Sequence, residues 1–317
     1  MSNTIYMSYL SKLQRNNKTY YYLVENIPVS KGKRKQIRKY IGTAKPTEQQ
    51  LSLELSKFEN EISPKKKQLQ GFTYLTKDEI KEIDEINSNF WKKYNTLTKT
   101  EKESFWNNFI SVFVYNTNSI EGSTLTLKEV ELLLSENISP NRPLEDVLET
   151  KSAKRAIDYL LDYKEDLSID LITELHKIYF KESFPEIAGK LKRLNNRIMG
   201  SKFDTTPKEF VLTDLKIFID NYNKLKKELH PIELSAWTHW AFVKIHPFQD
   251  GNGRISRLIM NFVLHKNKYA LIDIKTKEKQ AYFNALERCN YTSNGKPLAQ
   301  RLVRRFKKQY QNAFSEL

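Results

Sequence analysis

Residues 245–257 read Ile-His-Pro-Phe-Gln-Asp-Gly-Asn-Gly-Arg-Ile-Ser-Arg, a short loop and helix start between apolar helical segments, and the rest of the chain is organised around them. His246 is an ionisable base that titrates near physiological pH, so it can take a proton without much tuning. Pro247 fixes one backbone angle and discourages the preceding helix from continuing. Asp250 supplies a hard carboxylate oxygen, which suits a Mg²⁺ ion that keeps several waters and shares phosphate oxygens. The loop therefore predicts a base and a metal ligand close together.

Three small residues follow the aspartate, and two arginines follow them. Gly251, Asn252 and Gly253 let the backbone approach a ligand closely, and their N–H groups are free at a helix start, where the helix dipole favours an anion. Arg254 and Arg257 are three residues apart, so they lie on one face of that helix and can both reach a phosphate chain. Together with the base and the metal ligand, these groups indicate phosphoryl or nucleotidyl chemistry.

The same stretch resembles the signature of the Fic family, His-x-Phe-x-(Asp/Glu)-Gly-Asn-Gly-Arg-x-x-Arg, and every fixed position is present. Each residue alone fits an ordinary helix-ending turn with a glycine connection, but the combination favours the family. The resemblance covers roughly residues 105–310 and implies a mostly α-helical Fic core with one short β-hairpin. It also implies that His246 is the base, that Asp250 holds Mg²⁺, and that residues 251–254 and Arg257 bind the phosphates of ATP.

A second motif lies upstream of the signature. Residues 117–122 read Thr-Asn-Ser-Ile-Glu-Gly and match the Ser/Thr-x-x-x-Glu-Gly/Asn motif that Fic proteins use for auto-inhibition. The resemblance implies an inhibitory helix over residues 105–122 that carries Thr117 and Glu121. It implies that Glu121 pairs with Arg257 in the space that the γ-phosphate of ATP needs. The alternative is that Glu121 and Gly122 simply end a helix, with the glycine as its cap.

The composition is that of a basic globular chain. It has 317 residues, 39% of them hydrophobic, and a formal charge of +15. This allows a sizeable core, and the charge favours anionic partners or a lysine-rich surface. The single cysteine, Cys289, excludes an internal disulfide and indicates a reducing compartment. No leader-like segment and no run of membrane-spanning length is found, so we expect a cytoplasmic protein without a membrane partner.

Residues 1–45 differ from the rest of the chain. Aromatic and β-branched residues concentrate in Tyr6–Leu13, Thr19–Val29 and Gln36–Gly42, which predicts a small three-stranded antiparallel sheet. Basic residues alternate there with tyrosines. The sheet therefore either cradles nucleic acid or is a solvated hairpin whose tyrosines face the core.

Residues 46–70 contain one helical pattern and end in a lysine-rich run after Pro64, so we expect a connecting helix followed by a linker. The residues of that pattern are Leu51, Leu53, Leu55 and Phe58.

Residues 71–317 are predicted to form the helical Fic domain. Residues 187–203 break the helical period and resemble the Fic flap, a β-hairpin whose edge holds the target segment as an added strand; a plain surface hairpin is the alternative. Helices are expected over residues 77–94, 102–117, 126–136, 143–163, 170–180, 207–229, 231–245, 253–265, 277–289 and 298–314, the first five of them amphipathic.

The resemblance implies further nucleotide-binding residues. They are Met199, Gly200 and Ser201 in the flap, and Tyr282, Phe283 and Asn290 in the adenine pocket. Four other histidines have no partner pattern. We expect His239 in the core and assign no chemistry to His176, His230 or His265.

The resulting hypothesis is protein adenylylation, in which AMP passes from ATP to a Ser, Thr or Tyr hydroxyl of a target protein. Glu121 then keeps the enzyme slow until a partner, a change of oligomer or self-modification releases it. Self-adenylylation, for which Tyr20–Tyr22 offer hydroxyls, and a homodimer are both compatible with the sequence. Removal of AMP by the same groups is one alternative. A nucleotide-sensing regulator that binds nucleic acid through residues 1–45 is another.

Overall fold

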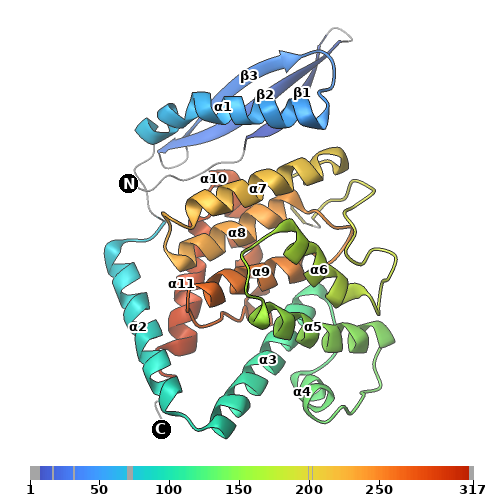
Figure 1. Cartoon of the computed structure of the whole chain (residues 1–317), viewed down its shortest axis with the longest axis vertical. Helices are drawn as coiled ribbons and strands as arrows, with labels where there is room; N and C mark the ends of the chain where they lie inside the picture. The colour runs from blue at the N-terminus through green and yellow to red at the C-terminus, as the bar shows by residue number, and fades with distance from the viewer. Residues whose placement is uncertain are drawn as a thin grey trace.

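The computed structural model describes residues 8–15, 18–30, 33–69, 74–198, 200–201 and 203–313. A small sheet with one helix lies at one end of the molecule, and a larger helical body lies beside it (Figure 1). The mostly α-helical class with a small N-terminal antiparallel sheet is therefore confirmed. Within the described ranges, no helix has an apolar stretch that would reach across a lipid bilayer.

The sheet consists of β1 (Tyr9–Arg15), β2 (Lys18–Ser30) and β3 (Lys33–Gly42), antiparallel and in the order β1-β2-β3. The central strand pairs Leu23 with Leu10 on one side and with Lys39 on the other. The three strands lie where the aromatic and β-branched runs predict them. Tyr6, where the first of those runs begins, lies outside the described residues.

Helix α1 (Glu48–Leu69) covers one face of the sheet (Figure 1). Leu51, Leu55 and Phe58 are at most 3% exposed and share a buried cluster with Leu23 of β2. Leu53 is 56% exposed, because a residue two positions along a helix lies on its opposite side. The strands and α1 therefore form one unit, which we call the N-terminal unit.

The N-terminal unit has its own small core and contacts the helical body through it. Ile62 is buried in the same cluster, and α1 continues through Pro64 to Leu69, where we expected a linker. Phe210, which directly precedes α7 (Val211–Leu225), and Ile217 within α7 pack against this cluster. The apolar face of α1 thus joins the sheet to the body.

The helical body contains ten α-helices in the described residues, close to the predicted ranges. They are α2 (Lys77–Thr96), α3 (Lys99–Glu121), α4 (Leu127–Ser135), α5 (Leu144–Asp162), α6 (Ile169–Phe180), α7 (Val211–Leu225), α8 (Pro231–Ile245), α9 (Asn252–Lys266), α10 (Lys279–Thr292) and α11 (Lys296–Tyr310).

Local sequence signals explain where several of these helices begin and end. At three starts a threonine side chain accepts a backbone N–H three residues on, and a glutamate at that position bonds back to the threonine backbone. These pairs are Thr76–Glu79, Thr98–Glu101 and Thr126–Glu129. Gly122 ends α3 in the left-handed conformation (φ 111°), which a glycine adopts at little cost. The helical reading of Glu121-Gly122 is therefore correct, whatever further role Glu121 has.

Helix α8 is the central helix of the body, with residues buried on all sides. Trp237 stacks on Phe218 of α7 with ring centroids 5.5 Å apart. His239 is fully buried, as expected, and its Nε2 lies 2.7 Å from the hydroxyl of Tyr282. A helix that is apolar all round belongs in a core. Because α8 is buried in the core, the loop that follows it starts from a fixed position at His246.

We predict that Phe218→Ala lowers the free energy of unfolding by about 3–5 kcal/mol, because it removes a fully buried ring from the α7–α8 contact. Leu212→Ala on the same helix is the matched control, since Leu212 is 37% exposed, and we expect a loss of about 1 kcal/mol or less. Urea denaturation followed by circular dichroism measures both. Equal losses in the two variants would contradict this packing.

Candidate active site

His246 ends α8 in the left-handed conformation (φ 54°, ψ 59°), which turns the chain sharply into the signature loop. Its Nδ1 lies 3.3 Å from the carbonyl oxygen of Val243, so Nδ1 carries the proton and Nε2 keeps its lone pair. Burial, together with the positive charge of Lys192, lowers the pKa of His246 to about 4. The side chain is therefore a neutral imidazole with Nε2 available to accept a proton.

The loop after His246 is held by Asn252. Its Oδ1 accepts the N–H of Phe248 at 2.9 Å, and its Nδ2 donates to the carbonyl of Phe248 at 2.8 Å. The side chain thus closes the loop, using its oxygen and one of the two N–H groups of Nδ2. The role of Asn252 in binding phosphate stays a prediction, and its backbone N–H at the start of α9 is one group that could serve it.

His176 on α6 supports the loop from the other side, a role that the sequence did not reveal. Its ring stacks on Phe248 with centroids 3.8 Å apart. Gly189 donates its N–H to Nδ1 at 2.9 Å, so Nε2 carries the proton and donates to the carbonyl of Asp250 at 3.1 Å. Burial lowers the pKa of His176 to about 4 and keeps it neutral. No local motif marks His176, because its partners in the signature loop, Phe248 and Asp250, lie more than 70 residues away along the chain.

The flap is organised around the same loop. The hairpin expected over residues 187–203 is reduced to two isolated antiparallel bridges, Leu191 with Phe248 and Arg197 with Asp204. The reason is that the first limb pairs with the signature loop. Asn196 donates to the carbonyl of Phe248 at 2.9 Å, and the N–H of Lys192 donates to Pro247 at 2.9 Å.

The start of α9 requires both of its glycines. Gly251 has φ 78°, and a Cβ there would lie 2.3 Å from the ring of Phe180. A Cβ on Gly253 would lie 2.3 Å from Oε1 of Glu121. The carboxylate of Glu121 therefore lies directly against the backbone at this helix start, where N–H groups and the helix dipole favour an anion.

Arg257 is 1% exposed and makes three hydrogen bonds to residues of α3. Its Nε donates to the hydroxyl of Thr117 at 2.7 Å, and its Nη2 donates to the Thr117 carbonyl at 3.0 Å and to Oε1 of Glu121 at 2.7 Å. The expected pair between Glu121 and Arg257 is thus present. Burial acts to raise the pKa of Glu121, but the charges of Arg257 and Arg254 outweigh it and lower that pKa.

Arg254 is also buried, and it binds a residue that the sequence did not suggest. Its Nη1 donates to Glu149 of α5, and its Nη2 donates to Oδ2 of Asp250 at 3.2 Å. Its guanidinium also lies 4.6 Å from the ring centroid of Phe180. Burial opposes the charge of Arg254, but Glu149 outweighs it and the pKa is raised. Arg254 is therefore fixed in position with its charge intact.

Asp250 is the candidate metal ligand. Its side chain is 63% exposed, and its Oδ1 accepts the N–H of Gly251. Among the described residues no group of three or more His, Cys, Asp or Glu side chains could hold a metal. One exposed carboxylate beside an anion site fits Mg²⁺, which takes hard oxygen ligands and fills its remaining positions with phosphate oxygens and waters.

Of the three residues proposed for the adenine pocket, two make hydrogen bonds within the protein and one lies on the surface. Tyr282 is 1% exposed and bonded to His239, and Asn290 accepts the indole N–H of Trp240 at 2.7 Å. Phe283 is 37% exposed on the surface of α10. Their role in binding adenine stays a prediction.

On the flap side, Ser201 donates to Glu287 of α10 at 2.9 Å, which joins the flap to this helix. Gly200 is exposed with φ 77°. Met199 lies outside the described residues.

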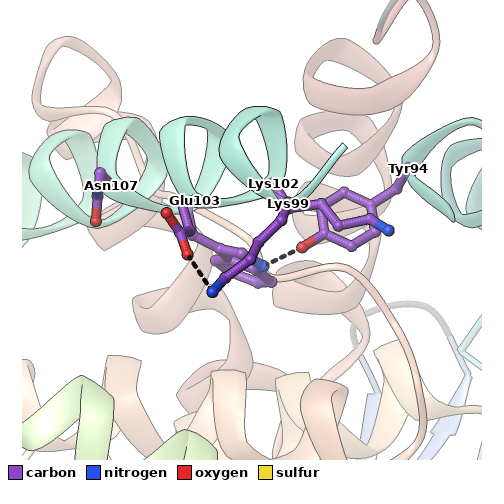
Figure 2. A pocket seen from close by; sticks show the side chains of 6 residues that line it. Tyr94, Lys99, Lys102, Glu103 and Asn107 are labelled. Atoms are coloured by element: carbon purple, nitrogen blue, oxygen red, sulfur yellow. Dashed lines mark hydrogen bonds and ion pairs between the residues drawn. The ribbon is translucent and has the colours of Figure 1, made fainter. Parts of the chain in front are cut away.

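A hollow of about 700 Å³ lies elsewhere, where α2 ends and α3 begins. Figure 2 shows Tyr94 and Lys99 on its walls, with Glu103 paired to Lys99. Trp106 donates to the hydroxyl of Tyr94 at 2.7 Å. No residue of the signature loop lines this hollow, so we assign the chemistry to the site around His246.

Comparison with known proteins agrees with this geometry. The Fic/DOC family model matches residues 166–264, which include the whole signature loop. A protein adenylyltransferase named fic-1 from Caenorhabditis briggsae is 30% identical over 186 residues, covering 56% of this chain and 36% of the relative. A protein adenylyltransferase Fic from Nematostella vectensis is 29% identical, covering 56% of this chain and 43% of the relative. The chain thus spans less than half the length of these relatives.

Solved structures share the fold over more of the chain. A Fic-domain-containing signalling protein from Bacteroides thetaiotaomicron is 29% identical with a TM-score of 0.66, covering 74% of this chain and 95% of that one. Residues 134–508 of Fic-1 from Caenorhabditis elegans give a TM-score of 0.64 at 21% identity, covering 83% of this chain and 75% of that one. From the matched family model and the intact signature loop, residues 166–264 are identified as a Fic/DOC-family region, and the Bacteroides thetaiotaomicron structure shares its fold.

Proposed function

We propose that this protein is a protein adenylyltransferase that moves AMP from ATP to a hydroxyl of a target protein. The observation that carries the proposal is the placement of a neutral base, His246, on the same short loop as the anion-binding start of α9. The relatives that match 56% of the chain are protein adenylyltransferases, which supports the same activity.

In the proposed reaction, Nε2 of His246 takes the proton from a Ser, Thr or Tyr hydroxyl of the target. The hydroxyl oxygen attacks the α-phosphorus of ATP, the bond from that phosphorus to the bridging oxygen breaks, and pyrophosphate leaves with that oxygen. The bond of Nδ1 to Val243 orients the ring for this step. A positioned base contributes about 10²–10⁴-fold in rate.

The phosphates of ATP would meet the start of α9. The backbone N–H groups of residues 251–253 would face the α-phosphate, and Arg257 would bind the terminal phosphates. Asp250 would hold Mg²⁺, which when bound neutralises phosphate charge. Because Arg254 is bound to Glu149 and Asp250, it would act mainly by orienting Asp250 and by adding positive charge.

We further propose that Glu121 inhibits this reaction. Its carboxylate lies against Gly253 and binds Arg257, so it occupies an anion position that a phosphate of ATP would need. Its side chain is 33% exposed, so water can hydrate the carboxylate once it leaves Arg257. Removal of AMP is a second candidate direction, favoured by the same carboxylate, which would position a water at the phosphorus.

We predict that Glu121→Gly increases AMP transfer about 10-fold or more, since a charge-assisted bond of about 1.5–3 kcal/mol no longer competes with ATP. Adding His246→Ala to this variant should remove about 10²–10⁴-fold of the rate. Intact-mass spectrometry after incubation with ATP and Mg²⁺ detects AMP-sized adducts on the protein itself. A fluorescent ATP analogue reports transfer to added proteins.

Glu121→Gln is the matched control for these variants. It keeps the volume of the side chain and removes its charge, so we expect a rate between those of the wild type and Glu121→Gly. A phosphate-sized adduct would keep the base and replace the group transferred. Tight ATP binding without any adduct, on the protein or on added proteins, would overturn the proposed transfer.

The pH dependence tests the state of His246. Its pKa is lowered to about 4, so the neutral base persists below pH 6.5, and the rate of Glu121→Gly should fall only as the pH approaches about 4. Lys192→Met removes a positive charge beside the ring, so the pKa of His246 should rise and the acid limb should move to higher pH. An acid limb near pH 6.5 in both variants would contradict the burial of this base.

A further inference from the structure

The two faces of the N-terminal sheet differ in what covers them. On the face toward α1, Lys39 lies 2.7 Å from Glu61 and 3.5 Å from Glu54, both on the helix. Tyr40 follows Lys39 along β3, so it lies on the other face, where it pairs directly with Tyr22. We call this second surface the open sheet face.

Strand pairing places further residues on the open sheet face, because residues directly opposite in antiparallel strands share a face. Lys18 and Tyr20 lie on the same side of β2 as Tyr22, and Arg15 of β1 pairs with Lys18. Arg38 lies on the same side of β3 as Tyr40. The open sheet face thus carries three tyrosines and three basic residues from all three strands.

The tyrosines form a continuous aromatic surface. The ring of Tyr40 lies 5.5 Å from that of Tyr22 and 6.2 Å from that of Tyr20, measured between centroids. Tyr40 is 52% exposed, although an aromatic ring gains from burial. Among the described residues no helix packs across this surface as α1 packs across the other, although Lys244 of α8 reaches its β1 edge and lies 5.7 Å from the ring centroid of Tyr9. An exposed aromatic row of this kind is available for stacking.

The charge of this region is strongly one-sided. Residues 1–45 contain ten Lys and Arg residues and a single acidic residue, Glu25, which gives +9 of the chain's net +15. Glu25 is fully buried and accepts the hydroxyl of Ser8 at 2.6 Å, so it does not offset the surface charge. Among ion pairs between described residues, none involves Arg15, Lys18 or Arg38, and all three side chains are exposed.

We propose that the open sheet face binds single-stranded nucleic acid, with bases stacked on Tyr20, Tyr22 and Tyr40 and phosphates bound by Arg15, Lys18 and Arg38. Strands about 4.8 Å apart place the rings within reach of two or three successive bases. A single strand exposes its bases for stacking, whereas a duplex hides them. The open sheet face offers aromatic rings for the bases and, beside them, basic side chains that make no ion pair with a described residue, for the phosphates. This inference does not rest on the proposed enzymatic function.

The experiment measures binding of fluorescein-labelled 12-nucleotide dT and rU strands to the full-length protein by fluorescence anisotropy between 50 and 200 mM KCl. Replacing Arg15, Lys18 and Arg38 together by Gln should weaken binding. It should also reduce the slope of log K against log salt by about 2, from roughly 0.7 per phosphate contact in a single strand. The matched control replaces three other exposed lysines, Lys81, Lys99 and Lys308, by Gln and should leave the slope unchanged.

Stacking is tested separately from charge. Tyr40→Ala should weaken binding on the order of 10-fold, whereas Tyr159→Ala, which removes a 37% exposed ring of α5 that lies beside Tyr163, should not. The proposal is overturned if the wild type does not bind either strand, if Tyr40→Ala binds as well as the wild type, or if a 12-base-pair duplex binds more tightly. AMP transfer by the same variants is measured in parallel, so a failure of the enzymatic proposal leaves this result interpretable.

Discussion

The helical body depends on two buried arginines in one helix. Arg254 and Arg257 are 5% and 1% exposed in α9, and a buried cation is stable only with charged or polar partners. Those partners come from other elements: Glu149 from α5, and Thr117 with Glu121 from α3. The contacts that pair the arginines therefore fix α3 and α5 against α9, whose start is the proposed anion site. Stability and site geometry here have one cause.

That arrangement fixes the loop of the candidate site and places a carboxylate beside it. The signature loop is closed by the side chain of Asn252 and supported by His176, so its backbone is set before any ligand arrives. Glu121 meanwhile supplies the carboxylate that Arg257 needs while no ligand is bound. In the proposed function a phosphate would replace that carboxylate as the partner of Arg257. Inhibition then follows from a requirement of the folded state, the pairing of a buried charge.

The N-terminal unit has a hydrophobic core separate from that of the helical body. Its core is a small cluster between α1 and the sheet, joined to the body through Phe210 and Ile217. One face of the sheet is thus covered by α1, and the other carries tyrosines and exposed basic residues. Alternation along a strand guarantees two such unlike faces whenever one of them is covered. The unit therefore combines a structural face with a charged aromatic surface.

Local patterns in the sequence determined most of the architecture. Helix caps such as Thr98 with Glu101, the apolar periods and the signature at residues 246–257 act over a few residues, so they can be read without the fold. Only the tertiary structure decided which groups meet. Glu149 and His176 reach the site across 105 and 74 positions, and no spacing rule covers such distances. The flap likewise keeps only one bridge of its own, Arg197 with Asp204, while Leu191 pairs with Phe248 of the signature loop, because this long-range contact takes the place of regular hairpin pairing.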